Sequence, residues 1–166
     1  MEEWFDVVDR NDMVTGRASR KQVHRDGLLH RSAHLLVFDS SGRVLLQRRS
    51  MSKDRFPGRW DSSVSGHVDS GEHYDQCIVR EAKEEIGVDL ETTPERLFKI
   101  DACNETDHEF TWVYRTVSEG PFVPNEEEIA EIVWLTKNDV NLMLETNPER
   151  VSPSFALIWD KIRKDS

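Results

Sequence analysis

The sequence predicts an α+β fold in which a mixed β-sheet lies between helices. Three observations support this prediction. Short apolar segments bounded by turn residues lie on both sides of one strongly amphipathic segment at residues 74–86. A second amphipathic segment follows Ser152-Pro153 near the end of the chain. The order is therefore strands, one helix, further strands and terminal helices, which is typical of a sheet with helices packed on its faces.

The first part of the chain predicts a hairpin, a short helix and a pair of strands. Arg10-Asn11-Asp12 has turn chemistry between two alternating segments, which predicts a hairpin over residues 4–18. Ser19 is the expected N-cap of a short helix through His24, which ends at Asp26-Gly27. Pro57-Gly58 predicts a loop over residues 50–61. The strands expected in this part cover residues 4–9, 13–18, 31–38 and 43–49, with a turn at residues 39–42.

Residues 74–86 form the most clearly predicted helix. At about 100° per residue, Ile78, Val79, Ala82 and Ile86 fall on one apolar stripe around the helix axis. Gly87 follows directly and supplies the left-handed residue that commonly ends a helix. We therefore expect this helix to pack its apolar stripe against the sheet.

The last part of the chain predicts further strands and two helices. Asn138 or Asp139 is the expected cap of a short helix. Because Ser152 precedes Pro153 at a first helical position, a C-terminal helix is expected over residues 152–165. Strands are expected near residues 96–103, 109–118 and 129–135. The apolar stripe of the C-terminal helix consists of Phe155, Ile158, Trp159 and Ile162.

Composition and charge exclude several classes of protein. The 166 residues suit a single domain over residues 1–166, and the formal net charge of −10 disfavours general nucleic-acid binding. The chain has no run of about 18 or more apolar residues, so no membrane span is expected. The start of the chain is acidic, unlike a secretory signal, and Cys77 and Cys103 are too few for a disulfide framework. We therefore expect a cytoplasmic protein.

Three glutamates lie close together on the helix predicted over residues 74–86. Glu81, Glu84 and Glu85 share an arc of about 100° by helix geometry. A like-charge pair one turn apart costs about 0.2–0.5 kcal/mol on an exposed helix, and burial of the charges costs far more. The cluster is therefore either a solvated face or a site for a hard divalent cation. Oxygen ligands suit Mg²⁺, and Mn²⁺ can substitute for it.

The residues around these glutamates form a longer pattern. It runs from Gly66 through Glu72 to Arg80-Glu81, Glu84-Glu85 and Gly87, with apolar residues at Ala82 and Val88. The pattern matches the Nudix box at every fixed position, so the sequence resembles a Nudix hydrolase. The resemblance implies a Nudix fold, an α/β/α sandwich in which residues 66–88 form a loop, a helix and a loop. It also implies Mg²⁺-dependent hydrolysis of a diphosphate bond in a nucleoside diphosphate derivative or a related small diphosphate.

The same resemblance implies roles for individual residues. Metal ligation falls to Glu81, Glu84, Glu85 and the backbone carbonyl of Ser65. Glu85 is the expected general base, with a loop glutamate as the alternative. One member of the acidic run Glu126-Glu127-Glu128 is a candidate for that loop position. The structural residues of the box are Gly66, Glu72, Arg80 and Gly87, of which Glu72 and Arg80 look like the pair that braces the loop.

A larger part of the chain, from about Asp6 to Thr136, resembles the isopentenyl-diphosphate isomerase-like branch of this family. The segments that carry this resemblance are Asn11-Asp12, His24-Arg25-Asp26-Gly27, His30-Arg31, Leu46-Gln47-Arg48-Arg49, Ser52-Lys53, Phe56-Pro57-Gly58-Arg59-Trp60 and Gly66-His67. The resemblance implies a metal site of His24, His30 and His67 with two acidic residues, Asp107 and Glu109. Imidazole with carboxylate suits Zn²⁺, Mn²⁺ or Mg²⁺. Glu109 is thereby a candidate catalytic residue beside Glu84 and Glu85.

The resemblance to isomerases breaks at one catalytic position. The isomerases need a cysteine just before the box glycine, where this chain has Ser65, and a hydroxyl is a far weaker acid than a thiol. The isomerases also typically degrade the glutamate box, which this chain keeps whole. Diphosphate hydrolysis is therefore the favoured activity. Isomerisation of an isoprenoid diphosphate and non-catalytic nucleotide binding are the alternatives.

Other residues are candidates for substrate contacts or for the core. Arg48 and Arg49 end a predicted strand, so alternation lets only one of them face the helix layer and clamp a phosphate. Trp60 is a candidate for stacking on a base or for closing the edge of the core. His34 and Cys77 are expected to be buried. The expected partner is a small-molecule diphosphate, and the protein is expected to be a monomer or a homodimer, because the hairpin offers an edge strand.

Overall fold

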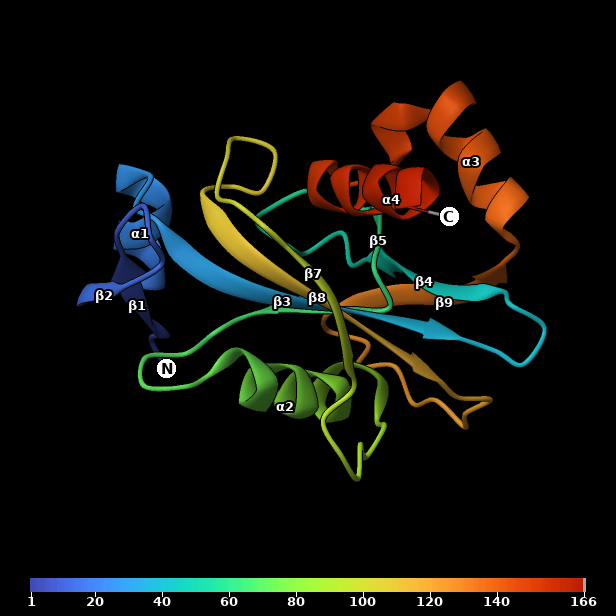
Figure 1. Ribbon diagram of the computed structural model, residues 1–166, viewed down its shortest axis with the longest axis horizontal. Coiled ribbons are helices and arrows are strands. Elements are labelled where there is room, and N and C mark those ends of the chain that lie inside the picture. Colours follow the sequence, from blue (N-terminus) through green and yellow to red (C-terminus); the bar gives the residue numbers. More distant parts are fainter. Residues whose placement is uncertain (166) are drawn as a thin grey trace.

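The computed structural model describes residues 1–165 (Figure 1). A small N-terminal unit precedes a larger sheet that is covered by helices on both faces. The N-terminal unit consists of β1 (Trp4–Val8), β2 (Val14–Ser19) and α1 (Arg20–Asp26). The larger sheet contains β3 (His30–Phe38), β4 (Val44–Arg49), β5 (Trp60–Asp61), β6 (Val64–His67), β7 (Glu95–Ile100), β8 (Glu109–Val117) and β9 (Ile129–Leu135). The remaining helices are α2 (Tyr74–Ile86), α3 (Lys137–Thr146), the 3₁₀ turn η1 (Pro148–Arg150) and α4 (Pro153–Asp165).

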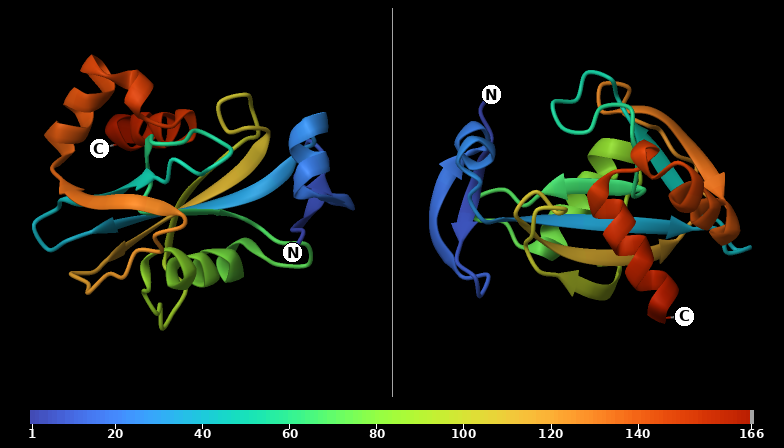
Figure 2. Two further views of the ribbon diagram at one scale, coloured as in Figure 1. Left: turned by 180° about the vertical axis from the view of Figure 1, so that it is seen from behind. Right: turned by 90° about the horizontal axis from the view of Figure 1, so that it is seen from above.

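The larger sheet is mixed, as expected. Its central strand β3 pairs in parallel with β8 and antiparallel with β4 and β6, while β9 pairs antiparallel with β4. Figure 1 shows α2 on one face and α3 and α4 on the other, and the reverse view in Figure 2 shows the same layers. The fold is therefore the α/β/α sandwich that the sequence predicted.

Each face of the sheet carries its own apolar core. On one face the predicted stripe of α2 is buried at Ile78, Ala82 and Ile86, together with Cys77, against β3 and β8. On the other face Phe155, Ile158 and Trp159 of α4 are buried, as their spacing predicted. Full burial of one such side chain stabilises the fold by about 1.5–3 kcal/mol. The two cores therefore hold the helices onto the sheet.

Residues 14–27 form the predicted end of the hairpin and the short helix. Ser19 caps α1, since its Oγ accepts a hydrogen bond from the backbone N–H of Gln22 at 3.2 Å. Gly27 ends the helix with φ +62°, a left-handed conformation that favours glycine. Figure 2 shows the hairpin and α1 at one end of β3.

Two aspartates fasten the hairpin to the rest of the molecule. Asp12 is buried in the hairpin turn and accepts hydrogen bonds from Arg31 Nε at 2.6 Å, Tyr74 Oη at 2.7 Å and Lys99 Nζ at 2.6 Å. Asp6 accepts hydrogen bonds from Ser70 Oγ at 2.8 Å and from a backbone N–H of the same loop. The hairpin is thus held beside the loop that precedes α2.

The structure corrects the expected boundaries in three places. Residues 60–61 and 64–67 are strands, although the loop was expected to extend to residue 61 and no strand was expected between that loop and α2. They were missed because their pairing with β4 and β3 is long-range and the segments are too short for a local period. The cap of α3 is Thr136, and not Asn138 or Asp139; Asp139 instead completes a capping box with Thr136. Strand β7 ends at Ile100, before the expected residue 103.

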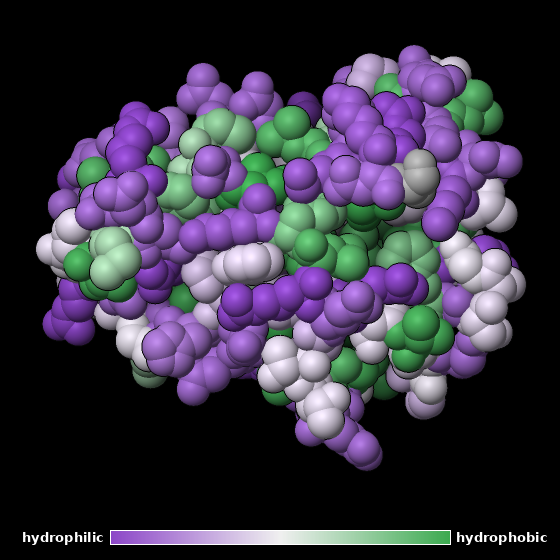
Figure 3. Space-filling view, viewed as in Figure 1, coloured by the Kyte–Doolittle hydropathy of each residue, from purple (hydrophilic) through white to green (hydrophobic). Residues whose placement is uncertain are grey.

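The surface is largely polar. Figure 3 shows hydrophilic residues over most of the face seen in Figure 1, with apolar residues visible in the groove between α4 and the strands. That groove is lined mainly by Phe38, Leu97, Phe98, Val117 and Ile162, with Arg115 and Lys137 beside them. Within residues 1–165, no helix has the length and apolar character needed to cross a membrane.

Candidate active site

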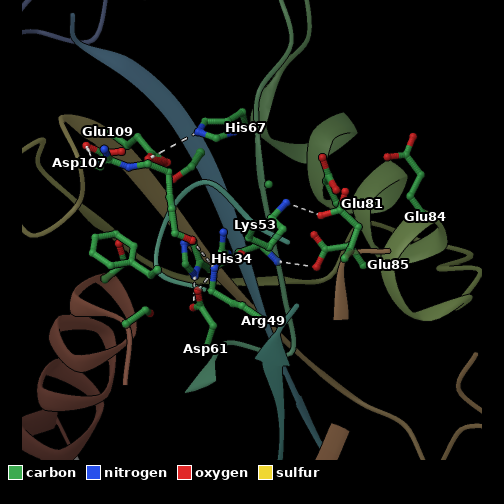
Figure 4. Close-up of a pocket in the computed structure, with 18 of the residues that line it drawn as sticks. His34, Arg49, Lys53, Asp61, His67, Glu81, Glu84, Glu85, Asp107 and Glu109 are labelled. Atoms are coloured by element: carbon green, nitrogen blue, oxygen red, sulfur yellow. Dashed lines mark hydrogen bonds and ion pairs between the residues drawn. The ribbon is translucent and has the colours of Figure 1, made fainter. Parts of the chain in front are cut away.

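A polar cavity lies between α2, the strands β3, β6 and β8, and the loop over residues 50–59. It collects acidic, basic and imidazole side chains from segments that are far apart in the sequence. Figure 4 shows the carboxylates of α2 on one side, His67 with Asp107 and Glu109 on the other, and Lys53 between them. The cavity therefore contains two clusters that could bind cations. We call them the carboxylate cluster (Glu81, Glu84 and Glu85) and the histidine cluster (His24, His30 and His67).

The carboxylate cluster is built on α2. Glu85 is buried, Glu81 has 14% of its side chain exposed, and Glu84 is exposed. Gly66 of β6 lies directly against Glu81: a Cβ atom at Gly66 would be 2.2 Å from Glu81 Cδ. Only a glycine leaves room for the carboxylate at this distance, which is the physical reason for the first residue of the box.

Arg80 connects the carboxylate cluster to the preceding loop. Its Nε and Nη2 donate to the two carboxylate oxygens of Glu72 at 2.8 and 2.9 Å, and Nη2 also donates to the His67 carbonyl at 3.1 Å. Its Nη1 donates to Glu81 at 2.8 Å and to Glu84 at 3.1 Å. The Glu72–Arg80 pair thus has the bidentate geometry of a brace between loop and helix.

Arg80 does not neutralise the whole cluster. Burial raises the pKa of Glu81 to about 7 in spite of Arg80. Burial and the neighbouring charge of Glu81 raise the pKa of Glu85 well above its usual range. The hydrogen bonds that Glu85 accepts within the described chain come from neutral groups, Gln47 Nε2 at 2.7 Å and the Ser65 backbone N–H at 3.3 Å. Buried, under-neutralised carboxylate oxygens fit a hard divalent cation such as Mg²⁺ or Mn²⁺.

The acidic loop contributes one more carboxylate. Of the run from Glu126 to Glu128, Glu128 lines the cavity, whereas Glu126 and Glu127 are exposed. Asn125 fastens the loop to the end of α2, because its backbone N–H donates to the Glu85 carbonyl at 2.8 Å. Glu128 forms an ion pair with Lys53, and its charge helps to raise the pKa of Glu85. Glu128 is therefore the loop glutamate that lies with the carboxylate cluster.

The histidine cluster brings together α1, β3 and β6. One ring nitrogen from each of His24, His30 and His67 lies within 4.8 Å of the others. Asp107 Oδ2 is 3.3 Å from His24 Nδ1, and Glu109 Oε2 is 3.7 Å from Nε2 of both His30 and His67. The predicted set of three histidines and two carboxylates is thus assembled in space.

Burial keeps the imidazoles of His30 and His67 neutral, and it leaves ring nitrogens of His24 and His30 without hydrogen-bond partners. It lowers the pKa of His30 to about 4 and the pKa of His67 well below its usual range. His30 Nδ1 lies 2.8 Å from the Leu28 carbonyl, so Nδ1 carries the proton and Nε2 carries a lone pair. His24 Nε2 and His30 Nε2 are buried and have no hydrogen-bond partner. Orphaned imidazole nitrogens beside carboxylates fit a transition metal such as Zn²⁺ or Mn²⁺.

Several basic side chains besides Arg80 line the cavity, namely Arg20, Arg49, Lys53 and Arg55. Asp61 holds Arg49 with an Nη1–Oδ2 distance of 3.5 Å, and Arg49 Nε donates to the Arg55 carbonyl at 3.0 Å. Arg48 does not line the cavity; its Nε donates to Glu131 of β9 at 2.8 Å. Strand alternation therefore selects Arg49 as the inward member of the pair.

Trp60 and His34 differ in whether they reach the cavity. Trp60 does not reach the cavity: it is 9% exposed and packs with Phe155 and Trp159 in the core beneath α4, so its position contradicts the predicted substrate contact. His34 is buried as expected, with Nδ1 2.8 Å from Ser62 Oγ, but it also lines the cavity.

Sequence reasoning assigned no role to Arg20, Gln47, Lys53 or Arg55. A usable signal existed for Gln47 and Lys53, since both lie in segments that resemble the isomerases. Arg20 and Arg55 were not recognisable, because their place in the cavity depends on how α1 and the loop over residues 50–59 dock.

The stability of the metal-free protein should fall between about pH 6.5 and 8. Glu81 and Glu109 have folded pKa values of about 7 and 8 against 4.5 in the unfolded chain, so stability falls as the pH rises through this range. The lowered pKa values of His30 and His67 make stability rise with pH, but only below the pKa of 6.5 that histidine has in the unfolded chain. Thermal melts in EDTA should show this fall in Tm, and Mg²⁺ or Mn²⁺ should reduce it. A flat profile in EDTA would contradict the assignment of these buried carboxylates.

Comparison with known proteins agrees with this geometry. The chain matches the NUDIX domain family over residues 28–155. It is 36% identical over 143 residues to an uncharacterized Nudix hydrolase of Yersinia pestis, covering 83% of this chain and 75% of that protein. It is also 31% identical over 164 residues to an isopentenyl-diphosphate Delta-isomerase of Kocuria rhizophila, covering 95% and 89% of the two chains.

The fold is shared with a solved structure over nearly its whole length. The crystal structure of DR0079 from Deinococcus radiodurans matches with a TM-score of 0.85 and 28% identity, covering 96% of this chain and 98% of that one. This coverage includes most of the N-terminal unit, which lies outside the family match. Since the family match covers most of the chain and the box residues surround one cavity, the chain belongs to the Nudix hydrolase family.

Proposed function

We propose that this Nudix hydrolase cleaves a diphosphate bond in a small molecule, such as a nucleoside diphosphate derivative, with Mg²⁺ as cofactor. The observation that carries the proposal is the carboxylate cluster, whose buried members are under-neutralised and share a cavity with basic side chains. A diphosphate offers the opposite charge to those basic residues, and its oxygens can complete the coordination of Mg²⁺.

The carboxylate cluster and two of the basic side chains have separate roles in this reaction. Glu81, Glu84, Glu85 and the Ser65 carbonyl would hold Mg²⁺. When bound, the ion neutralises phosphate charge and lowers the pKa of water. Arg49 and Lys53 bind phosphate oxygens, and Arg49 is oriented for this by Asp61. Glu85 accepts the proton of the water whose oxygen attacks phosphorus, and the bond between that phosphorus and the bridging oxygen breaks.

The test is a panel of diphosphate compounds followed by ³¹P NMR. The panel contains nucleoside diphosphate sugars, dinucleotides, nucleoside diphosphates and prenyl diphosphates. We expect cleavage of at least one class in Mg²⁺ and none in EDTA. If no class is cleaved with either Mg²⁺ or Mn²⁺, the proposal is wrong.

Isomerisation of an isoprenoid diphosphate is the second candidate. The histidine cluster and the similarity to the Kocuria enzyme favour it. The residue before the box glycine is Ser65, however, and Cys77 is buried with its Sγ directed at the His67 carbonyl, 3.4 Å away. Neither cysteine is among the described residues that line the cavity. We therefore expect no transfer of deuterium from solvent into isopentenyl diphosphate, and transfer would establish this activity instead.

The histidine cluster should bind a transition metal independently of the carboxylate cluster. His24→Ala removes one imidazole, so the affinity for Co²⁺, followed by its visible absorption, should fall at least about tenfold. Glu81→Gln and His73→Ala should leave it unchanged, because Glu81 belongs to the other cluster and His73 is exposed at the start of α2. Equal Co²⁺ affinity in His24→Ala and the parent would show that the three histidines do not form a site.

We also propose a cellular compartment and an oligomeric state for the protein. The thiols of Cys77 and Cys103 are free, which agrees with a reducing, cytoplasmic compartment. We propose a monomer or a homodimer with a small-molecule substrate.

A further inference from the structure

A buried amide on β4 contacts the glutamate proposed as the general base. Gln47 is 3% exposed. Alternation along β4 places it on the same face of the sheet as Leu45, which packs in the core under α2. Its Nε2 donates to Glu85 Oε1 at 2.7 Å and to the Ser63 carbonyl at 3.2 Å. Because both partners are acceptors, the nitrogen end of the amide must face Glu85.

A second donor converges on the same carboxylate oxygen. The backbone N–H of Ser65, on β6, lies 3.3 Å from Glu85 Oε1. Two donors from two different strands therefore engage Oε1, and neither of them engages Oε2. A glutamate side chain is otherwise free to rotate about three bonds, so these contacts fix the direction in which its second oxygen points.

We infer that Gln47 is a positioning residue that holds Glu85 with one oxygen committed to the sheet and the other directed to the reaction. The inference rests on the proposed function, in which Glu85 accepts a proton. Gln47 is not among the described residues that line the cavity, so it acts through Glu85 and does not contact substrate. Partners that orient a ligating or reacting group in this way typically contribute about 10–100-fold to metal affinity or activity.

Gln47→Met tests the inference, because it keeps the length and apolar bulk of the side chain and removes the donor. We expect kcat to fall about 10–100-fold while KM changes less than about threefold. The affinity of the carboxylate cluster for Mn²⁺, measured by EPR after Zn²⁺ has filled the histidine cluster, should fall about tenfold. A purely structural role would change Tm and leave kcat and the Mn²⁺ affinity unaltered.

Two further variants make the comparison decisive. Gln47→Glu has the same length but faces Glu85 with an acceptor, so its loss of kcat should be at least as large, and it replaces the methionine variant if that one does not fold. Gln22→Met, on the exposed face of α1, is the matched control and should behave as the parent. The inference is overturned if either Gln47 variant keeps kcat and Mn²⁺ affinity within about twofold of the parent.

A failure of the role inferred for Gln47 can be distinguished from a failure of the proposed function. If the parent cleaves no diphosphate, the proposed function fails. The Mn²⁺ titrations of the parent and of Gln47→Met still show whether the amide orients Glu85, because they require no turnover.

Discussion

Glu85→Gln should lower kcat for diphosphate hydrolysis by at least about 10³-fold. The change keeps the shape of the side chain and the acceptor that Gln47 and Ser65 contact, but removes the basic oxygen and the negative charge. Loss of a general base alone costs about 10²–10⁴-fold, and loss of a metal ligand adds to it. The measurement is product release at saturating Mg²⁺.

The Tm of Glu85→Gln distinguishes a loss of chemistry from a loss of folding. Burial raises the pKa of Glu85, so the ionised carboxylate opposes folding when no cation is bound. The Tm of Glu85→Gln in EDTA should therefore equal or exceed that of the parent. Glu126→Gln, an exposed glutamate on the loop that carries Glu128, is the matched control and should retain full activity. Parent-like turnover in Glu85→Gln would remove Glu85 from the mechanism.

Gly66→Ala should impair both stability and activity. The added Cβ would meet Glu81 Cδ at 2.2 Å and Oε1 at 2.3 Å, so the carboxylate or strand β6 must move. Overpacking of this kind costs about 1–3 kcal/mol, and for a chain of this size each kcal/mol lowers Tm by roughly 2–4 °C. Because Glu81 belongs to the carboxylate cluster, we also expect kcat to fall at least about 10²-fold, since misplaced catalytic groups are costly.

The control for this variant is Gly16→Ala. Gly16 lies on the exposed strand β2, and a Cβ there would meet no atom within 4 Å. Calorimetry should show no loss of stability for Gly16→Ala and a clear loss for Gly66→Ala. A Gly66→Ala protein with the Tm and kcat of the parent would mean that Glu81 can relax away from β6 without consequence.

The parts of the site that lie close together in the sequence were predictable. The stripe of Ile78, Ala82 and Ile86 follows from helical periodicity, and the same helix brings Glu81 and Glu85 to one face. The Glu72–Arg80 brace joins a loop to the helix that follows it, and it was expected through the resemblance to the Nudix box. The histidine cluster was expected only through resemblance, because His24, His30 and His67 come from three separate elements.

The sequence by itself determined the sandwich fold, the box helix and its acidic face, because these depend on local periodicity and on capping residues that act within a few positions. Tertiary structure decided which glutamate of the acidic run and which of Arg48 and Arg49 enter the cavity, and it decided between the two readings of Trp60. It also directed Gln47 at Glu85. Those outcomes depend on which strands pair and in which register. Pairing is decided by burial and hydrogen bonding between segments far apart in the chain, for which no local pattern exists.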